Sequence, residues 1–398
     1  MIRRFVNVVA QNYESSMYSL HRLDVAKHLF YPSTADAEAA ATASENANDG
    51  RVGGRKPKPR MFDRLRRLPA PIMRFQPPPT ADSSCWSPPA GTFVLLSPRS
   101  SDGRILHISA DGHALLYDAD SCSTCAMPGF DKPERRPIAV TAAGPGNEEC
   151  EGLYMMTDHQ NYHYGFKVLD LRQYPRRWQP LPLPPFAAKY SSHIKSFTVV
   201  DGGRTICVSC NEPAVDELEL FRVAWPVDLA DRTYCFDTAS REWRRAGEWA
   251  LPFDGRAEYH PHHLCSSDLS AIDAMGAPRE APALEHVWED LSLPPDEKVS
   301  IVLNRRFPNI IRTTTKKWCV GNPSLVNLGS GKFCIAKVVL ATETVFLSYS
   351  YTPDDEPLGE FAVLTGVEVV PDGEGGLRMV KHKSKRYVFT SDEIKWVF

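Results

Sequence analysis

The chain has 398 residues, with 46 Lys and Arg residues against 49 Asp and Glu residues and a formal net charge of −3. This balance excludes a protein whose overall charge would attract nucleic acid or a membrane surface. The 33 prolines and 24 glycines predict many short strands and sharp turns rather than long helices. No apolar stretch approaches the roughly 20 residues that span a bilayer, so we expect no membrane association.

Residues 1–32 are expected to form a strand pair and a short helix that pack on the rest of the chain. Apolar residues alternate with period two over residues 5–9, residues 18–25 read as the hairpin partner, and a short helix lies near residues 26–30. The basic, acid-poor start also resembles a mitochondrial presequence, but the alternating valines favour a strand. We therefore expect a cytoplasmic or nuclear protein, with mitochondrial import as the less favoured alternative.

The composition changes abruptly after residue 32. Residues 33–60 have almost no large apolar side chains, so burial cannot offset the entropy of ordering them. We predict a disordered, basic, Pro- and Ala-rich linker or loop over residues 33–84. It contains a candidate nuclear-import signal made of Arg55, Lys56, Lys58, Arg60, Arg64, Arg66 and Arg67. A solvated linker and a weak contact with nucleic-acid phosphates are the alternative interpretations of this run.

Strand and turn signals alternate from residue 85 to the C-terminus. Asp111-Gly112 and Asp201-Gly202 each separate two strand-like runs and predict hairpins, because glycine readily supplies a positive φ. The glycine-rich turns at residues 329–331 and 372–376 continue this rhythm.

A short pattern recurs four times between residues 110 and 300: a strand-like run, a polar stretch that often contains Trp, and a Leu-Pro or Met-Pro stop. The stops begin at Met127, Leu183, Leu251 and Leu293. The first three runs end in Asp118, Asp170 and Asp237. Carboxylates at equivalent places of a repeat favour turn-capping side chains over a catalytic acid and base. The tryptophans, which we expect to pack between strands, are Trp178, Trp243 and Trp288.

The recurring pattern predicts an all-β fold. The spacing of the stops centres on the length of a propeller blade, and residues 85–398 offer about 310 residues at roughly 40 to 55 per blade. We therefore predict a β-propeller of five or six blades, in which the N-terminal strands join the last blade and close the ring. A pair of β-sandwiches is the alternative architecture.

Several segments carry a resemblance to a known family. They are RRFVN at residues 3–7, YSLHRLDV at residues 18–25, CVGNPSL at residues 319–325 and GSGKFCI at residues 329–335. In these segments the chain resembles the large grass-expanded plant family called domain of unknown function sixteen-eighteen. The resemblance implies a propeller of kelch-like or F-box-associated character and brings no agreed activity or catalytic residues.

The densest group of possible metal ligands consists of His260, His262, His263 and Cys265. Period two would place His260 and His262 on one face of a strand, close enough to share a metal. Pro261 disturbs such a strand, so we interpret the group as polar loop residues and expect no bound metal or cofactor. A metal-dependent oxidase or hydrolase built on these histidines remains an alternative.

Two Cys-x-x-Cys pairs, Cys122 with Cys125 and Cys207 with Cys210, resemble halves of a zinc site. Their separation is far outside the spacing of zinc fingers. Residues three apart in a strand also point to opposite faces. We therefore expect reduced thiols in a reducing compartment.

The chain contains no phosphate-binding loop, nucleophile elbow or paired-histidine zinc motif. We therefore expect a monomeric, non-enzymatic propeller scaffold that binds a protein partner through its loop-bearing face. A nuclear, nucleic-acid-associated protein is the other alternative.

Overall fold

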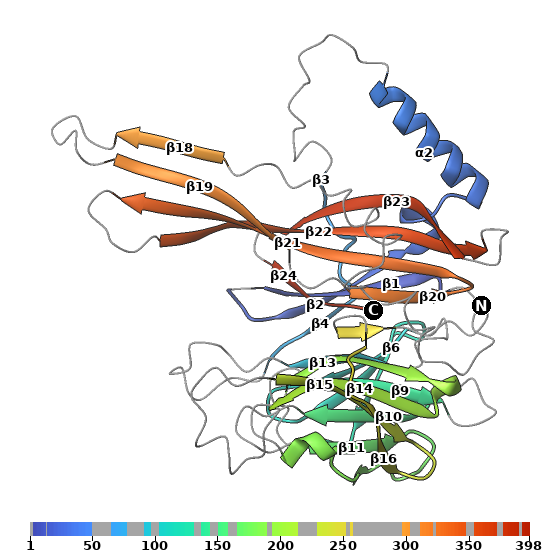
Figure 1. Cartoon of the computed structure of the whole chain (residues 1–398). Helices are drawn as coiled ribbons and strands as arrows, with labels where there is room; N and C mark the ends of the chain where they lie inside the picture. The colour runs from blue at the N-terminus through green and yellow to red at the C-terminus, as the bar shows by residue number, and fades with distance from the viewer. Residues whose placement is uncertain are drawn as a thin grey trace. The chain divides into compact units, whose positions relative to one another are not determined.

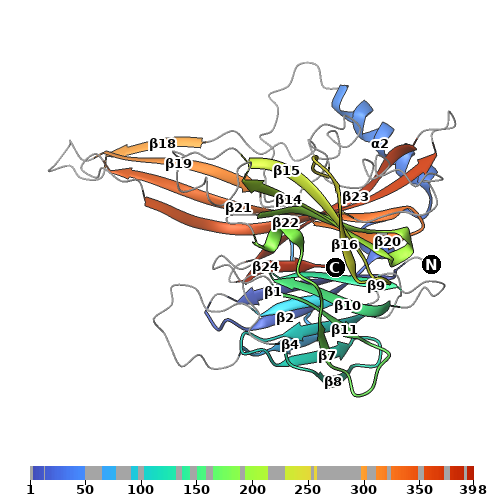
Figure 2. The ribbon, with the colours of Figure 1, turned by 60° about the horizontal axis from the view of Figure 1, so that its bottom comes forward.

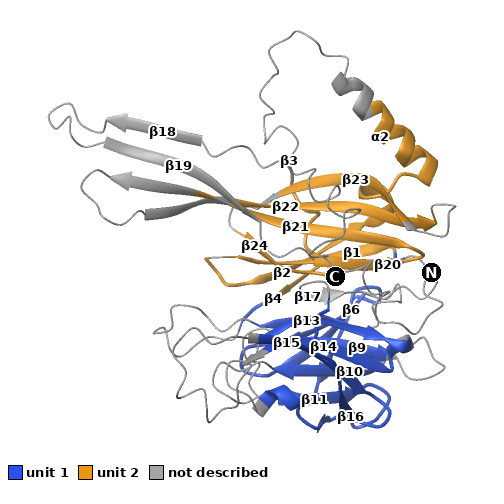
Figure 3. Ribbon diagram, in the orientation of Figure 1, with its two compact units in different colours: residues 1–3, 76–281, 398 blue, residues 4–75, 282–397 orange. Residues whose placement is uncertain are grey.

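The computed structural model describes residues 3–12, 14–49, 65–77, 91–96, 103–130, 137–143, 150–157, 165–188, 193–213, 229–251, 255–257, 297–302, 311–320, 324–347, 354–371, 377–389 and 392–398. Within these ranges the chain is nearly all β, and five largely antiparallel sheets form a five-bladed β-propeller. The predicted fold class is therefore confirmed, with five blades rather than six. The sheets fall into two compact units, which are described separately below (Figure 3).

Unit 1 comprises residues 1–3, 76–281 and 398 and holds three sheets (Figures 1 and 2). The first contains β5 (Thr92–Leu95), β6 (Arg104–Ile108), β7 (Ala114–Asp118) and β8 (Ser123–Met127). The second contains β9 (Ile138–Ala143), β10 (Cys150–Thr157), β11 (Gly165–Asp170) and β12 (Trp178–Pro180). The third contains β13 (His193–Val200), β14 (Thr205–Pro213), β15 (Leu229–Asp237), β16 (Glu242–Gly247) and β17 (Gly255–Ala257). Two short 3₁₀-helices are η1 (Pro185–Ala188) and η2 (Asp201–Gly203).

The middle sheet of unit 1 buries both of its faces. Along β10, Leu153 and Met155 point into a core shared with β6, whereas Met156 points into a core shared with β14 and β15. Successive side chains of a strand alternate between faces, so one strand can serve two cores. The apolar content of β10 is therefore explained by its position between two other sheets.

The predicted hairpins form where glycine or a polar residue adopts a left-handed conformation. Gly112 has φ 90° and joins β6 to β7, while Asp201 with φ 54° and Gly203 with φ 108° join β13 to β14. The turn at residues 329–331 joins two strands of unit 2, and all three of its residues have positive φ. The turn at residues 372–376 lies outside the described ranges.

Unit 2 comprises residues 4–75 and 282–397 and holds two sheets. The first has the order β24 (Asp392–Val397), β1 (Phe5–Asn12), β2 (Tyr18–Asp24) and β4 (Met73–Phe75). The second contains β18 (Glu297–Val302), β19 (Ile311–Val320), β20 (Ser324–Gly329), β21 (Lys332–Leu347), β22 (Asp354–Pro371), β23 (Leu377–Phe389) and β3 (Leu65–Arg66). Helix α1 (Val25–His28) follows β2 directly.

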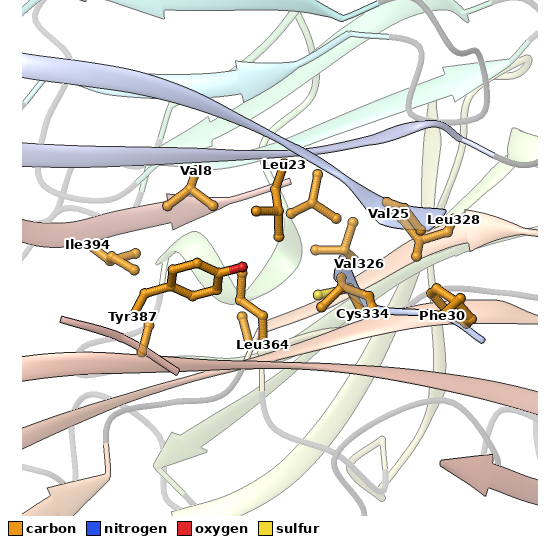
Figure 4. Close-up of a cluster of buried hydrophobic side chains, with 14 of the residues drawn as sticks. Val8, Leu23, Val25, Phe30, Val326, Leu328, Cys334, Leu364, Tyr387 and Ile394 are labelled. Atoms are coloured by element: carbon orange, nitrogen blue, oxygen red, sulfur yellow. The ribbon is translucent and has the colours of Figure 1, made fainter. Parts of the chain in front are cut away.

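The two ends of the chain meet in one sheet. Strand β1 pairs antiparallel with β2 on one side and with β24 on the other, and the Asn12 side chain donates to Asp392 Oδ1 at 2.8 Å. The N-terminal strand pair therefore joins the last strand, as expected for closure of the ring. Figure 4 shows the core that this sheet shares with the second sheet of unit 2, where Val8 and Leu23 face Leu364 and Tyr387.

Residues Thr34–Asp49 differ from the prediction, because they form an α-helix, α2, instead of a disordered linker. Ser33 caps its start, since the Asp36 N–H donates to Ser33 Oγ at 3.2 Å and the Ser33 hydroxyl donates to Asp36 Oδ2. Alanine has the highest helix propensity, and the small Ala37 side chain is buried. The prediction of disorder from low hydrophobicity is therefore wrong for residues 34–49. Residues 65–77, also inside the predicted linker, contain β3 and β4.

The stability of unit 1 is expected to depend on pH through His107 of β6. Its ring is 5% exposed and stacks on Phe93 at a centroid distance of 4.5 Å. Burial lowers the pKa of His107 from 6.5 to about 4, and the charge of Asp111 opposes this shift only in part. The unfolded chain therefore binds the proton more tightly than the folded protein. The resulting stability is complete above pH 6.5 and decreases as the pH falls towards about 4, by up to roughly 3 kcal/mol.

We predict that His107→Gln removes this part of the acid sensitivity. Urea unfolding measured from neutral pH down to about pH 4 should give a flatter dependence of the free energy of unfolding on pH than the wild type. His113→Gln replaces an exposed imidazole on the neighbouring turn and should keep the wild-type dependence. Equal slopes for the wild type and His107→Gln would contradict the prediction.

Candidate functional site

The candidate metal ligands His260, His262, His263 and Cys265 lie outside the described ranges, as does most of the candidate import signal, namely Arg55, Lys56, Lys58, Arg60 and Arg64. Of that signal, Arg66 lies in β3, which pairs in parallel with β23, and Arg67 is exposed. No group of three or more His, Cys, Asp or Glu residues that could hold a metal occurs among the residues whose positions are described.

The two Cys-x-x-Cys pairs do not come together as one ligand set. Cys207 and Cys210 of β14 are both buried but belong to different cores on opposite faces of the sheet, as the strand period predicts. Cys122 and Cys125 are exposed free thiols at the start of β8 and within it. The geometry therefore supports thiols rather than a shared zinc site.

The three repeated aspartates cap turns, which confirms the interpretation from the sequence. Asp118 Oδ1 accepts the N–H groups of Asp120 at 2.9 Å and Ser121 at 3.1 Å, and Asp237 Oδ1 accepts those of Ala239 and Ser240 at 2.8 and 3.1 Å. Asp170 Oδ1 accepts the Arg172 N–H at 2.9 Å. The backbone bond from Ser121 contributes most to holding the pKa of Asp118 below its usual value. The backbone bonds from Ser240 and Ala239 lower the pKa of Asp237 in the same way. The carboxylates are thus occupied in ordering the backbone.

Two tryptophans that follow these turns hydrogen-bond to the Met-Pro or Leu-Pro stop at the end of the preceding sheet. The Trp178 indole donates to Pro128 O at 3.1 Å and meets the Phe130 ring edge-on at 4.9 Å. The Trp243 indole donates to Pro182 O at 2.9 Å. The second stop is therefore Leu181-Pro182 rather than the Leu183-Pro184 expected from the sequence, since Leu181 is buried and Leu183 is exposed. Trp288 lies outside the described ranges.

The turn between β11 and β12 presents an aromatic side chain to solvent. Tyr174 is 93% exposed, more than any other large hydrophobic side chain whose exposure is described. The turn is held by the Asp170 cap, by Arg176 Nε donating to Leu171 O at 3.3 Å, and by Trp178. Arg172 and Arg177, on either side of Tyr174, are exposed as well.

A chain of side-chain hydrogen bonds extends this surface to the neighbouring turn. Arg241 donates to Gln179 Oε1 at 3.2 Å, and Gln179 Nε2 donates to Gln173 Oε1 at 3.3 Å. We name this surface the Tyr174 rim. It consists of Arg172, Gln173, Tyr174, Arg177, Gln179 and Arg241. This surface was not predicted from the sequence, although the Tyr-Pro-Arg-Arg run directly before a repeat tryptophan was a usable signal.

In unit 2 a group of polar side chains in mutual contact surrounds His382 of β23. His382 Nε2 lies 3.1 Å from Glu368 Oε2, which also accepts the Thr34 hydroxyl at 2.8 Å, and His382 Nδ1 accepts the Tyr31 N–H at 3.2 Å. Burial lowers the pKa of His382 despite the nearby carboxylate. Burial alone would raise the pKa of Glu368, but the bonds from Thr34 and His382 outweigh it and leave the pKa low. These bonds anchor the segment before α2 on the sheet and point to a structural role.

We predict that Asp118→Ala lowers the free energy of unfolding by about 1 kcal/mol, because two backbone N–H groups lose their acceptor. Asp118→Asn keeps the Oδ1 acceptor and should lose no more than about half as much. Urea unfolding at neutral pH measures both. Equal losses for the two variants would show that the charge, and not the turn bonds, matters.

Among the described residues, no helix is both long and apolar enough to cross a bilayer.

Two solved structures are similar in part. The WD40 domain of SCAP from fission yeast has 12% sequence identity and a TM-score of 0.19, with 80% of this chain and 62% of that chain covered. The dihydro-heme d1 dehydrogenase NirN in complex with DHE has 9% identity and a TM-score of 0.23, with 90% and 74% covered. The chain thus spans less than two thirds of the length of the first, and likenesses this weak carry no functional argument.

No curated protein matches the chain. A family model described as "Protein of unknown function (DUF1668)" matches residues 3–387. The expected membership in a family of unknown function is thereby confirmed. The matching family is DUF1668, however, and not family sixteen-eighteen as expected from the sequence. With nearly its whole length matched and its sheets arranged as five blades, the chain belongs to the DUF1668 family.

Proposed function

We propose that this protein is a non-enzymatic propeller scaffold that binds a protein partner through the Tyr174 rim. The observation that carries the proposal is the 93% exposure of Tyr174 on a turn whose backbone is fixed on both sides. Tyrosine and arginine are the residue types most enriched where interfaces gain their binding energy.

The fixed turn reduces the cost of binding. A flexible loop loses conformational entropy when a partner immobilises it, whereas a turn that is already ordered loses little. The Asp170 cap, the Arg176 bond to Leu171 O and the Trp178 bond to Pro128 O order the backbone around Tyr174 before any partner arrives.

The charge of the rim favours an acidic partner. Arg172, Arg177 and Arg241 are exposed around Tyr174, and each guanidinium can pair with a carboxylate in a bidentate geometry. We therefore propose a partner that places an acidic segment against an aromatic contact. Two longer inter-strand loops, at residues 211–231 and 274–284, lie largely outside the described ranges.

Three further features belong to the proposal. Residence in the cytoplasm or nucleus is supported by the cationic run at residues 55–67 and by the reduced thiols expected from the sequence. A plant source and a kelch-like or F-box-associated character are carried over from the resemblance drawn for residues 3–7, 18–25, 319–325 and 329–335, and the all-β sheets agree with a propeller character.

We predict that Tyr174→Ala weakens partner binding by about 2 kcal/mol, roughly 30-fold in Kd, as expected for an aromatic hot spot. Proteins captured from an extract of the source organism by immobilised wild-type chain identify the partner. Its affinity for each variant is then measured with the purified partner. Arg172→Glu combined with Arg177→Glu should also weaken binding and reduce its salt dependence.

Leu183→Ala is the matched control, because Leu183 is a 54% exposed apolar residue of the same unit outside the rim. It should bind like the wild type. Equal affinities for wild type and Tyr174→Ala would refute the role of the rim, and capture that disappears after nuclease treatment would favour nucleic-acid association instead.

A further inference from the structure

Two buried cysteines meet across neighbouring strands of unit 1. Cys207 of β14 lies directly opposite Cys235 of β15, and their Sγ atoms are 3.0 Å apart. Both are free thiols, 1% and 0% exposed. The contact is closer than the ordinary packing of two sulfur atoms.

The strand pairing places these two cysteines where a disulfide fits. The Thr238 N–H donates to Arg204 O at 2.8 Å, so these two residues form a hydrogen-bonded pair at the end of the β14–β15 ladder. Hydrogen-bonded and non-hydrogen-bonded pairs alternate along an antiparallel ladder. Cys207 and Cys235 lie three steps further along this ladder and are therefore a non-hydrogen-bonded pair. In that class the Cα atoms are about 4.5 Å apart, within the range that a disulfide spans.

The surroundings make one of the two sulfurs the nucleophile. The hydrogen bond from the Cys207 thiol lowers the pKa of Cys235, burial opposes this shift, and the positive charge of Arg244 adds to it. The same contact and burial raise the pKa of Cys207. Arg244 of β16 lies opposite Cys235 in the next strand pair. Because Arg244 lies in the strand next to Cys235 and one strand further from Cys207, its positive charge favours the thiolate on Cys235 and leaves Cys207 as the resolving thiol.

The hydrophobic core around the pair is small. Val200 and Leu251 are the other buried members of its small core, and Ala246 is only partly buried. Arg244, next to Cys235 along the sheet, is exposed. An exposed, positively charged residue therefore lies opposite the buried Cys235.

We propose that Cys207 and Cys235 are a thiol oxidation site, which a hydroperoxide converts to a reversible disulfide between β14 and β15. The Cys235 thiolate attacks one peroxide oxygen, the O–O bond breaks, and the sulfur becomes a sulfenic acid while water or an alcohol leaves. The Cys207 sulfur then attacks the Cys235 sulfur, the S–O bond breaks, and a second water leaves. The two thiols lose two electrons to the peroxide, and a small-molecule thiol restores them.

The test uses the full chain and hydrogen peroxide at neutral pH, followed by catalase and by alkylation with N-ethylmaleimide in guanidinium. Trypsin digestion without reductant gives the peptides of residues 205–222, which contain Cys207 and Cys210, and 233–241, which contain Cys235. We expect a linked species of these two peptides that dithiothreitol abolishes. Recovery of both peptides fully alkylated, with oxidation confined to other cysteines such as Cys122 and Cys125, overturns the proposal.

Two variants assign the roles. Cys210→Ala removes the other cysteine of peptide 205–222 and should leave the linked species unchanged. If the linked species disappears in this variant, the link belongs to Cys210 and the proposal is overturned. Cys207→Ala should leave a sulfenic acid on Cys235 that dimedone traps on peptide 233–241, and an absent adduct in a folded variant contradicts Cys235 as the nucleophile. Chain unfolded in guanidinium before peroxide should lose the selective link, and if Cys207→Ala does not fold, the wild type and Cys210→Ala decide the outcome.

Discussion

A sheet with apolar side chains on both faces needs a neighbour on each side, and the middle sheet of unit 1 shows how this protein supplies them. Alternate residues of β10 enter two different cores, so the strand cannot be stable as part of an isolated sheet. The Trp178 and Trp243 indoles add directional hydrogen bonds to this non-directional hydrophobic packing. Each donates to the carbonyl of a proline that follows the last strand of the preceding sheet, which ties the edge strand β12 or β16 to the end of that sheet.

In these turns, the side chains that order the backbone differ from the side chains that are exposed to solvent. The repeated carboxylates at Asp118, Asp170 and Asp237 all accept backbone N–H groups, so their charge is used inside their own turns. Arg172, Tyr174 and Arg177 of the Asp170 turn are exposed instead. The proposed recognition surface therefore consists of side chains that lie outside the cores.

The sequence predicted most of the fold because turn chemistry and strand period are local signals. The Asp-Gly turns, the terminal strand pair and the aspartate caps follow from the φ preferences of glycine and from short side-chain bonds. The α2 helix was missed because its stability comes from alanine propensity and a serine cap instead of hydrophobic burial.

The candidate sites were harder to predict than the fold, because they depend on which strands become neighbours. The exposure of Tyr174 depends on bonds to Pro128 and Leu171, and the meeting of Cys207 with Cys235 depends on the β14–β15 register. Sequence spacing pairs Cys207 with Cys210, yet the pleat of the strand sends those two thiols to opposite faces.

The position of β1 between β2 and β24 has a consequence for biosynthesis. The sheet needs residues from both ends of the chain, so a ribosome-bound polypeptide carries β1 with one edge unpaired until residues 392–397 have emerged. An unpaired edge can recruit strands from other chains. The outer edge of the first strand therefore stays open to unwanted pairing through nearly the whole of synthesis, until the last strand covers it.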